Sequence, residues 1–179
     1  MKQIRRNVFE TNSSSTHSIC ISKEPVSAKG QLIHFYIGEY GWENDCVDAA
    51  DYLYTAILEQ RDGDELLEKL KEILDSNNIK YKFEEPKYWT SDSGNKYLDN
   101  GGIDHSYETR EFIDAVLSDA DMLMRCLFGD SCVYTGNDNS SDYDDMCYSA
   151  YDTIWDDNYK EIPNPNHDSE NYDYFFKGN

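Results

Sequence analysis

The sequence predicts an α+β fold, with a small mixed or antiparallel sheet packed by three to four amphipathic helices and an irregular acidic C-terminal tail. Two observations lead to this prediction. Apolar residues recur at helical spacing in three segments, and short apolar runs bounded by glycine lie between them. The length of 179 residues fits one domain. We place that domain at residues 1–137, with an acidic, aromatic-rich extension at 138–179.

In the amino-terminal half, the apolar runs predict strands at 19–21 and 31–37. A helix is expected from Asn44 or Asp45 to about Gln60, and a second helix over 64–75. The alternation of apolar and basic residues over 79–83 indicates a strand with one solvent-exposed face.

In the carboxyl-terminal half, residues 86–107 are rich in Asn, Asp, Ser and Gly, and an irregular segment is expected there. A wide apolar stripe over 108–128 predicts one long helix that ends before Gly129. A strand is expected at 131–135 and a short helix at 148–155. The chain after Pro163 is predicted to be irregular.

The charge is extreme, because 36 acidic residues face 16 basic ones and give a net charge of −20. This charge argues against affinity for duplex DNA or for an anionic membrane surface, since both depend on Lys and Arg. Disorder is also excluded, because 39% of the residues are hydrophobic and 14% aromatic.

The charge is unevenly distributed along the chain. Residues 1–37 carry a net charge of +3, which leaves −23 for the rest, and residues 129–179 alone carry −10. The basic amino-terminal part can therefore pair with the acidic remainder within one fold or between two copies, so a homodimer is possible. Charge of this size also steers a protein toward basic partners.

The sequence begins with a charged and polar stretch rather than an apolar signal segment, and no run approaches the roughly 20 apolar residues of a membrane helix. Five scattered cysteines without a Cys-x-x-Cys pair favour a reduced protein. We therefore expect a cytoplasmic protein.

Acidic residues recur three or four positions apart on each predicted helix, which places them on one face. Their spacing of about 4.5–6 Å along a helix approximates an array of phosphates. A single row of this kind is ordinarily a solvated helix face. The predicted partner-binding residues of the three rows are Asp45, Asp48, Asp51, Glu65, Glu68, Glu72, Glu108, Glu111 and Asp114.

The tail combines carboxylates with aromatic residues, and aromatic side chains often anchor protein interfaces. Some of these rings are expected to pack on the core instead. The predicted partner-binding residues of the tail are Asp138, Asp142, Tyr143, Asp144, Asp145, Asp156 and Asp157.

The block at residues 7–18 surrounds His17 with six hydroxyl side chains. Serine near histidine can form a nucleophile and base pair, and a loop rich in hydroxyls can hold a phosphate. The alternative is a turn-forming loop whose side chains cap the backbone. On the catalytic interpretation the candidate residues are Ser13, Ser14, His17, Asp104 and His105.

No metal or cofactor is predicted. His17, His34, Asp104 and His105 could gather around a metal ion, but no spacing typical of zinc or calcium sites supports this.

The block at residues 7–18 resembles the amino-terminal signature of a group of proteins from phages and mobile elements of Firmicutes-type bacteria. The blocks at 38–42, 104–106 and 135–139 are similar to other recurring blocks of that group. In size and charge the chain also resembles anti-CRISPR proteins that block Cas9. That resemblance implies an acidic surface that occupies the basic channels or the PAM-reading residues of Cas9.

Two functional hypotheses follow. The first is a non-catalytic anti-CRISPR inhibitor that binds Cas9, or the Cas9–guide RNA complex, through an acidic, DNA-mimicking surface. The second is a small phosphate- or nucleotide-handling enzyme centred on the Ser/His block and the Asp104–Ser106 block. A structural protein of a virion is a third possibility.

Overall fold

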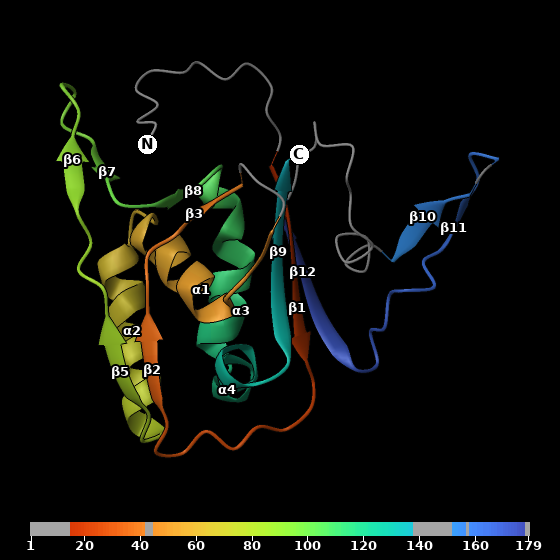
Figure 1. Ribbon diagram of the computed structural model, residues 1–179, viewed down its shortest axis with the longest axis horizontal. Coiled ribbons are helices and arrows are strands. Elements are labelled where there is room, and N and C mark those ends of the chain that lie inside the picture. Colours follow the sequence, from red (N-terminus) through yellow and green to blue (C-terminus); the bar gives the residue numbers. More distant parts are fainter. Residues whose placement is uncertain (1–14, 42–44, 138–151, 157, 178–179) are drawn as a thin grey trace.

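The computed structural model describes residues 15–41, 45–137, 152–156 and 158–177 (Figure 1). Its largest sheet has four antiparallel strands in the order β12-β1-β9-β4. The strands are β1 (Ser15–Ser22), β4 (Asp45–Val47), β9 (Ser131–Asn137) and β12 (Tyr172–Lys177). The sheet thus joins strands from both ends of the chain.

Strand β1 lies in the middle of this sheet and is buried along almost its whole length. Ile19 and Ile21 of β1 and Val133 of β9 belong to the hydrophobic core. The register places His17 opposite Thr135 of β9, two positions along from the pair Ile19 and Val133. One end of the sheet therefore carries a polar pair next to this apolar pair.

The four α-helices described are α1 (Ala49–Leu58), α2 (Gly63–Ser76), α3 (Arg110–Ser118) and α4 (Ala120–Phe128). A short 3₁₀ helix, η1 (Ser106–Thr109), precedes α3. In Figure 1 helices α1, α3 and α4 lie between the four-stranded sheet and a second, two-stranded sheet, and α2 overlaps the second sheet in this view. Helix α1 contacts the other three helices and strand β9, and most of its residues are buried, so it forms the centre of the core.

The second sheet pairs β2 (Leu32–Phe35) with β5 (Lys80–Phe83) in parallel. Its inner face packs on the helices, where the rings of Phe35 and Phe83 are stacked with centroids 4.7 Å apart. Its outer face is exposed, and Leu32 retains 51% of its accessible surface.

Three further strand pairs are small. They are β3 (Glu39–Tyr40) with β8 (Gly102–Ile103), β6 (Tyr88–Thr90) with β7 (Lys96–Leu98), and β10 (Thr153–Trp155) with β11 (Glu161–Pro163). The β6–β7 hairpin projects from the top left of the molecule in Figure 1.

The predicted α+β class is confirmed, and the predicted helix over 64–75 and strand over 79–83 match α2 and β5 closely. The predicted single helix over 108–128 is wrong. The chain is extended at Asp119, whose carboxylate accepts hydrogen bonds from the backbone N–H groups of Asp121 (2.9 Å) and Met122 (3.2 Å). This aspartate caps a new helix, which separates α3 from α4.

Three other local predictions are also corrected. The helix expected from Asn44 or Asp45 begins only at Ala49, because residues 45–47 form the edge strand β4. Within the described residues of the helix expected at 148–155, Thr153–Trp155 is a strand. Part of the segment expected to be irregular at 86–107 forms β6, β7 and β8.

The C-terminal tail is not irregular at its end, because β12 pairs with β1 over six residues. Asp173 of β12 accepts a hydrogen bond from Arg125 of α4 at 3.0 Å and lies 3.5 Å from the ammonium of Lys23. A lysine of the basic first 37 residues therefore pairs with the acidic tail within one chain.

Cys46 of β4 and Cys132 of β9 form a disulfide across adjacent strands. The scattered cysteines favoured a reduced protein, and the structure differs at this pair. None of the helices in the described part of the chain combines the length and apolar character needed to cross a membrane.

Candidate functional site

His17 is completely buried in β1, and its ring faces helix α1. Its Nδ1 atom lies 2.6 Å from the hydroxyl oxygen of Tyr52, and the two rings meet edge to face with centroids 5.5 Å apart. Burial raises the pKa of Tyr52 well above its ordinary value, so its hydroxyl stays protonated. The histidine is therefore held by a neutral phenol within the core.

Ser15, His17 and Asp104 surround Gly41, which follows β3. A Cβ atom at Gly41 would lie 3.0 Å from Asp104 Cβ and 3.1 Å from both His17 Nε2 and Ser15 Cβ. Ser15 Oγ also donates a hydrogen bond to the backbone oxygen of Asp104 at 3.4 Å. Gly41 has φ +107, a conformation that favours glycine. We call Ser15, His17, Gly41, Tyr52 and Asp104 the His17 cluster.

Glu59 lies close to this cluster at the end of α1. Its carboxylate accepts a hydrogen bond from the backbone N–H of Ile103 at 2.8 Å. Burial raises its pKa from 4.5 to about 7, and the charge of Asp104 acts in the same direction. Sequence reasoning missed this residue, because an acid near a helix end is ordinarily solvated.

His105 follows Asp104 and adopts a left-handed backbone conformation with φ 53. Its Nε2 lies 4.0 Å from a carboxylate oxygen of Asp104. Its Nδ1 is buried and has no hydrogen-bond partner among the described residues. His105 is therefore adjacent to the His17 cluster, because its imidazole lies near the carboxylate of Asp104, which belongs to the cluster.

The structure thus brings together three of the five predicted catalytic residues, His17, Asp104 and His105, from distant parts of the sequence. Ser13 and Ser14 lie outside the described residues. The neighbouring Ser15 takes part in the cluster instead. The backbone of Gly41 lies close against the side chains of Ser15, His17 and Asp104, and no larger residue fits at this position without a shift of its neighbours. No group of metal-ligating side chains occurs among the residues that the structure describes.

The first predicted acidic row does not form a helix face. Asp48 is the N-cap of α1 and accepts hydrogen bonds from the backbone N–H groups of Ala50 (2.8 Å) and Asp51 (3.2 Å). Asp51 accepts one from the backbone N–H of Tyr36 at 2.7 Å, and burial raises its pKa. These two carboxylates therefore stabilise local structure and do not form part of an exposed acidic row.

The other two rows lie on α2 and α3. Arg110 at the start of α3 bonds Asp62, just before α2, at 2.8 Å and Asp114 at 2.9 Å, so the amino-terminal ends of the two helices are neighbours. Around this junction we define the α2–α3 acidic face as the exposed residues Asp64, Glu65, Glu68, Glu72, Glu111 and Asp114.

Within this face, Glu68 pairs with Lys71 at 2.7 Å and Asp114 pairs with Arg110. The carboxylates of Asp64, Glu65, Glu72 and Glu111 have no lysine or arginine partner among the described residues.

The remaining predicted partner-binding residues are distributed elsewhere. Glu108 belongs to η1 and is half-buried. Asp156 follows β10 and accepts backbone hydrogen bonds from Asn158 and Lys160. The side chain of Asp45 and all of Asp138, Asp142, Tyr143, Asp144, Asp145 and Asp157 lie outside what the structure describes.

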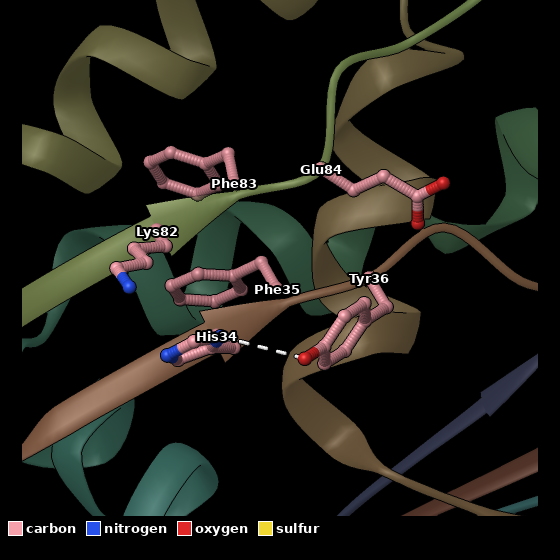
Figure 2. Close-up of a pocket in the computed structure, with 6 residues that line it drawn as sticks. All are labelled: His34, Phe35, Tyr36, Lys82, Phe83 and Glu84. Carbon is pink, nitrogen blue, oxygen red and sulfur yellow. Dashed lines mark hydrogen bonds between the residues drawn. The ribbon is translucent and has the colours of Figure 1, made fainter.

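A shallow hollow of about 410 Å³ lies on the exposed side of the β2–β5 sheet. Figure 2 shows the rings of His34 and Tyr36 side by side there, with the Tyr36 hydroxyl oxygen 3.4 Å from His34 Nδ1. Glu84 at its rim accepts a hydrogen bond from the backbone N–H of Ile37 at 3.0 Å. The hollow contains none of the predicted catalytic residues.

The β6–β7 hairpin carries an exposed aromatic pair that sequence reasoning missed. The rings of Trp89 and Tyr97 stack at 4.7 Å, and each side chain remains nearly half exposed. On the same hairpin the ammonium of Lys96 lies 3.7 Å from the ring centroid of Tyr88. The signal was present in the sequence, because Tyr88 and Trp89 precede the turn residues at 91–95 and Tyr97 follows them, a pattern typical of a hairpin.

The sequence and the structure were compared with protein-family models, curated proteins and solved structures, and none of the three comparisons found a match.

Proposed function

We propose that this chain is a non-catalytic anti-CRISPR inhibitor that binds a basic nucleic-acid-binding surface of a host defence nuclease, with Cas9 as the specific candidate. The observation that carries the proposal is the exposed, largely unpaired carboxylate surface on a folded chain with a net charge of −20. The α2–α3 acidic face is its centre.

The balance of ion pairs supports this proposal. Among the described residues, Lys and Arg form ion pairs with only four carboxylates: Asp62, Glu68, Asp114 and Asp173. The carboxylates of Asp64, Glu65, Glu72 and Glu111 on the α2–α3 acidic face therefore remain available to arginine and lysine side chains of a partner, with which charge-assisted hydrogen bonds form. Complementary charge of this kind accelerates association and selects basic partners.

The aromatic hairpin adds the apolar component that a specific interface needs. Tryptophan and tyrosine contribute most of the binding energy in many interfaces, usually within a rim of polar groups. The hairpin lies near the acidic face. Burial is the main cause that raises the pKa of Tyr88, and the charge of Asp64, a residue of that face, raises it further because the two side chains are close enough to interact. Trp89 and Tyr97 would supply apolar contacts next to the carboxylates.

The test is a titration of purified Cas9–guide RNA complex with the full chain at low and at high salt. We expect tight binding at low salt that weakens steeply as salt screens the charges. Absence of binding at low salt would refute the Cas9 assignment. Binding that does not change with salt would refute the electrostatic mechanism.

The His17 cluster favours a second candidate function, a small phosphate- or nucleotide-handling enzyme. A hydroxyl, an imidazole and a carboxylate meet there, and these are the group types of a nucleophile, a base and an orienting acid. In this case Ser15 and His17 would act on the substrate, and Asp104 and His105 would support them.

The matching test measures hydrolysis of p-nitrophenyl phosphate and of nucleoside triphosphates by the full chain. Turnover that is lost in Ser15→Ala and His105→Ala, while both variants keep the wild-type melting temperature, would support the enzyme. Turnover equal to the buffer control would exclude this activity for these substrates and leave the cluster a structural role.

A further inference from the structure

Three cysteines lie on adjacent strands of the four-stranded sheet. Cys46 of edge strand β4 is bonded to Cys132 of β9, with Cα atoms 6.4 Å apart and 86 positions apart in sequence. On the other side of β9, Cys20 of β1 is in register with Cys132. The topology therefore gives Cys132 two cysteine neighbours, one on each flanking strand.

The environments of the four cysteines that the structure describes differ in a way that favours oxidation of one pair. Cys46 is exposed and Cys132 is half-buried. Cys20 is bonded to neither, and burial raises the pKa of its thiol to about 11. Cys126 is buried in α4, where burial raises its pKa to about 12. Because the thiolate is the reactive form, Cys20 and Cys126 are protected from exchange at neutral pH.

We infer that Cys46 and Cys132 form a reversible oxidation site that exchanges with low-molecular-weight disulfides such as oxidised glutathione. The exposed position of Cys46 at the sheet edge and its contact with Cys132 carry this inference. It is independent of the proposed inhibitor function.

The exchange proceeds in two balanced steps. The Cys46 thiolate attacks one sulfur of the external disulfide, forms a mixed disulfide and expels one external thiolate. The Cys132 thiolate then attacks the Cys46 sulfur, forms the internal disulfide and expels the second external thiolate. Overall, the two protein thiols lose two electrons and two protons, and the external disulfide is reduced to two thiols.

The Cys46–Cys132 disulfide holds a short strand that has few other contacts with the sheet. Strand β4 has only three residues and is an edge strand, held to the sheet by its pairing with β9. The next residue after β4, Asp48, is the N-cap of α1, the central helix of the core. Oxidation therefore adds a covalent link between the sheet and the segment that leads into α1, and reduction removes this link while the β4–β9 pairing and the packing of α1 remain.

The experiment incubates the reduced full-length protein with glutathione buffers of graded redox potential, blocks free thiols and maps disulfides by peptide mass spectrometry. We expect a Cys46–Cys132 crosslink that forms and is removed reversibly without denaturant. Cys46→Ser should abolish it, whereas the matched control Cys20→Ser should retain it. A crosslink between Cys20 and Cys132 as the main product, or no crosslink at any potential, would overturn the inference.

Thermal unfolding of the same samples gives a second readout. From the usual effect of a disulfide that closes a long loop, the oxidised protein should melt roughly 5–15 °C above the reduced protein. The shift should persist in Cys20→Ser and vanish in Cys46→Ser. A disulfide that is reduced only after unfolding would show a permanent structural bond and contradict reversibility.

Discussion

Glu59 gives the most direct pH dependence that the structure predicts. Its pKa is raised from 4.5 to about 7, mainly because burial disfavours the charged carboxylate. The folded protein therefore holds a proton on Glu59 between these two pH values, while the unfolded chain has already released it. Stability must fall as the pH rises from about 4.5 to about 7, and it changes no further through this group above that range.

The size of the effect follows from the difference between the two pKa values. At 1.36 kcal/mol per pKa unit, the free energy of unfolding falls by about 3 kcal/mol across this pH range through Glu59 alone. Glu59→Gln removes the titrating group and keeps an oxygen that can accept the backbone N–H of Ile103. The variant should therefore lose less stability than the wild type over the same range.

The assay is urea unfolding of wild type and Glu59→Gln at pH 5 and at pH 8, followed by tryptophan fluorescence. For each protein, the loss is the decrease in the free energy of unfolding from pH 5 to pH 8. The loss of the wild type minus the loss of Glu59→Gln gives the contribution of Glu59, because the other carboxylates are the same in both proteins. We expect this difference to approach about 3 kcal/mol. Equal losses in both proteins would refute the placement of Glu59 in a buried site.

Three further predictions concern packing in the fold. Gly41→Ala should lower the free energy of unfolding, measured in urea, by about 2–5 kcal/mol, because the new Cβ would meet His17 and Asp104 and because alanine disfavours this φ. A decrease below about 0.5 kcal/mol would contradict the geometry of the cluster. Tyr52→Phe should cost about 1–3 kcal/mol, since the buried Nδ1 of His17 loses the hydroxyl; unchanged stability would show that this hydrogen bond is not formed. Deletion of residues 172–179 removes β12 and exposes the edge of β1, so the free energy of unfolding should fall by at least about 3 kcal/mol or the chain should aggregate. A truncated chain as stable as the wild type would show that β12 is dispensable.

The fold class and the most regular elements were predictable because their signals are local. Helix α2 shows a clear repeat, with buried Leu66, Leu70 and Leu74 on one side and acids on the other. The break at Asp119 was missed because the apolar stripe continues through it. The competing signal, an aspartate able to cap a new helix, was present in the sequence but was outweighed by the periodicity.

Strands β4 and β12 could not be predicted from local pattern. Both depend on pairing with residues far away in the sequence, β4 with β9 and β12 with β1. A possible helix cap at Asn44 or Asp45 favoured a helix at the position of β4, and Pro163 and Pro165 favoured an irregular tail. In the same way, spacing alone could not show that Asp48 is a helix cap rather than part of an exposed charged row.

The sequence could predict several residues of the candidate site, but not how the fold arranges them. His17, Asp104 and His105 were chosen by residue type, and the structure brings them together through β1, Gly41 and the segment after β8. Tyr52 and Glu59 were missed because a tyrosine and a glutamate on a helix carry no motif. Their roles arise from burial, which only the tertiary fold creates.

The central claim is that the α2–α3 acidic face binds the basic partner, and one charge-matched comparison tests it most directly. Glu65, Glu72 and Glu111 are changed together to Gln. Their control is the triple variant Glu24→Gln, Glu85→Gln and Glu170→Gln, which neutralises three exposed acids outside the α2–α3 acidic face and the β6–β7 hairpin.

The measurement is the affinity of each variant for the Cas9–guide RNA complex at low salt. From the typical strength of exposed ion pairs, the first variant should bind roughly three- to hundredfold more weakly than wild type, and the control should change little. Equal loss in both variants would show that net charge alone attracts the partner, and unchanged binding by the first variant would contradict the claim.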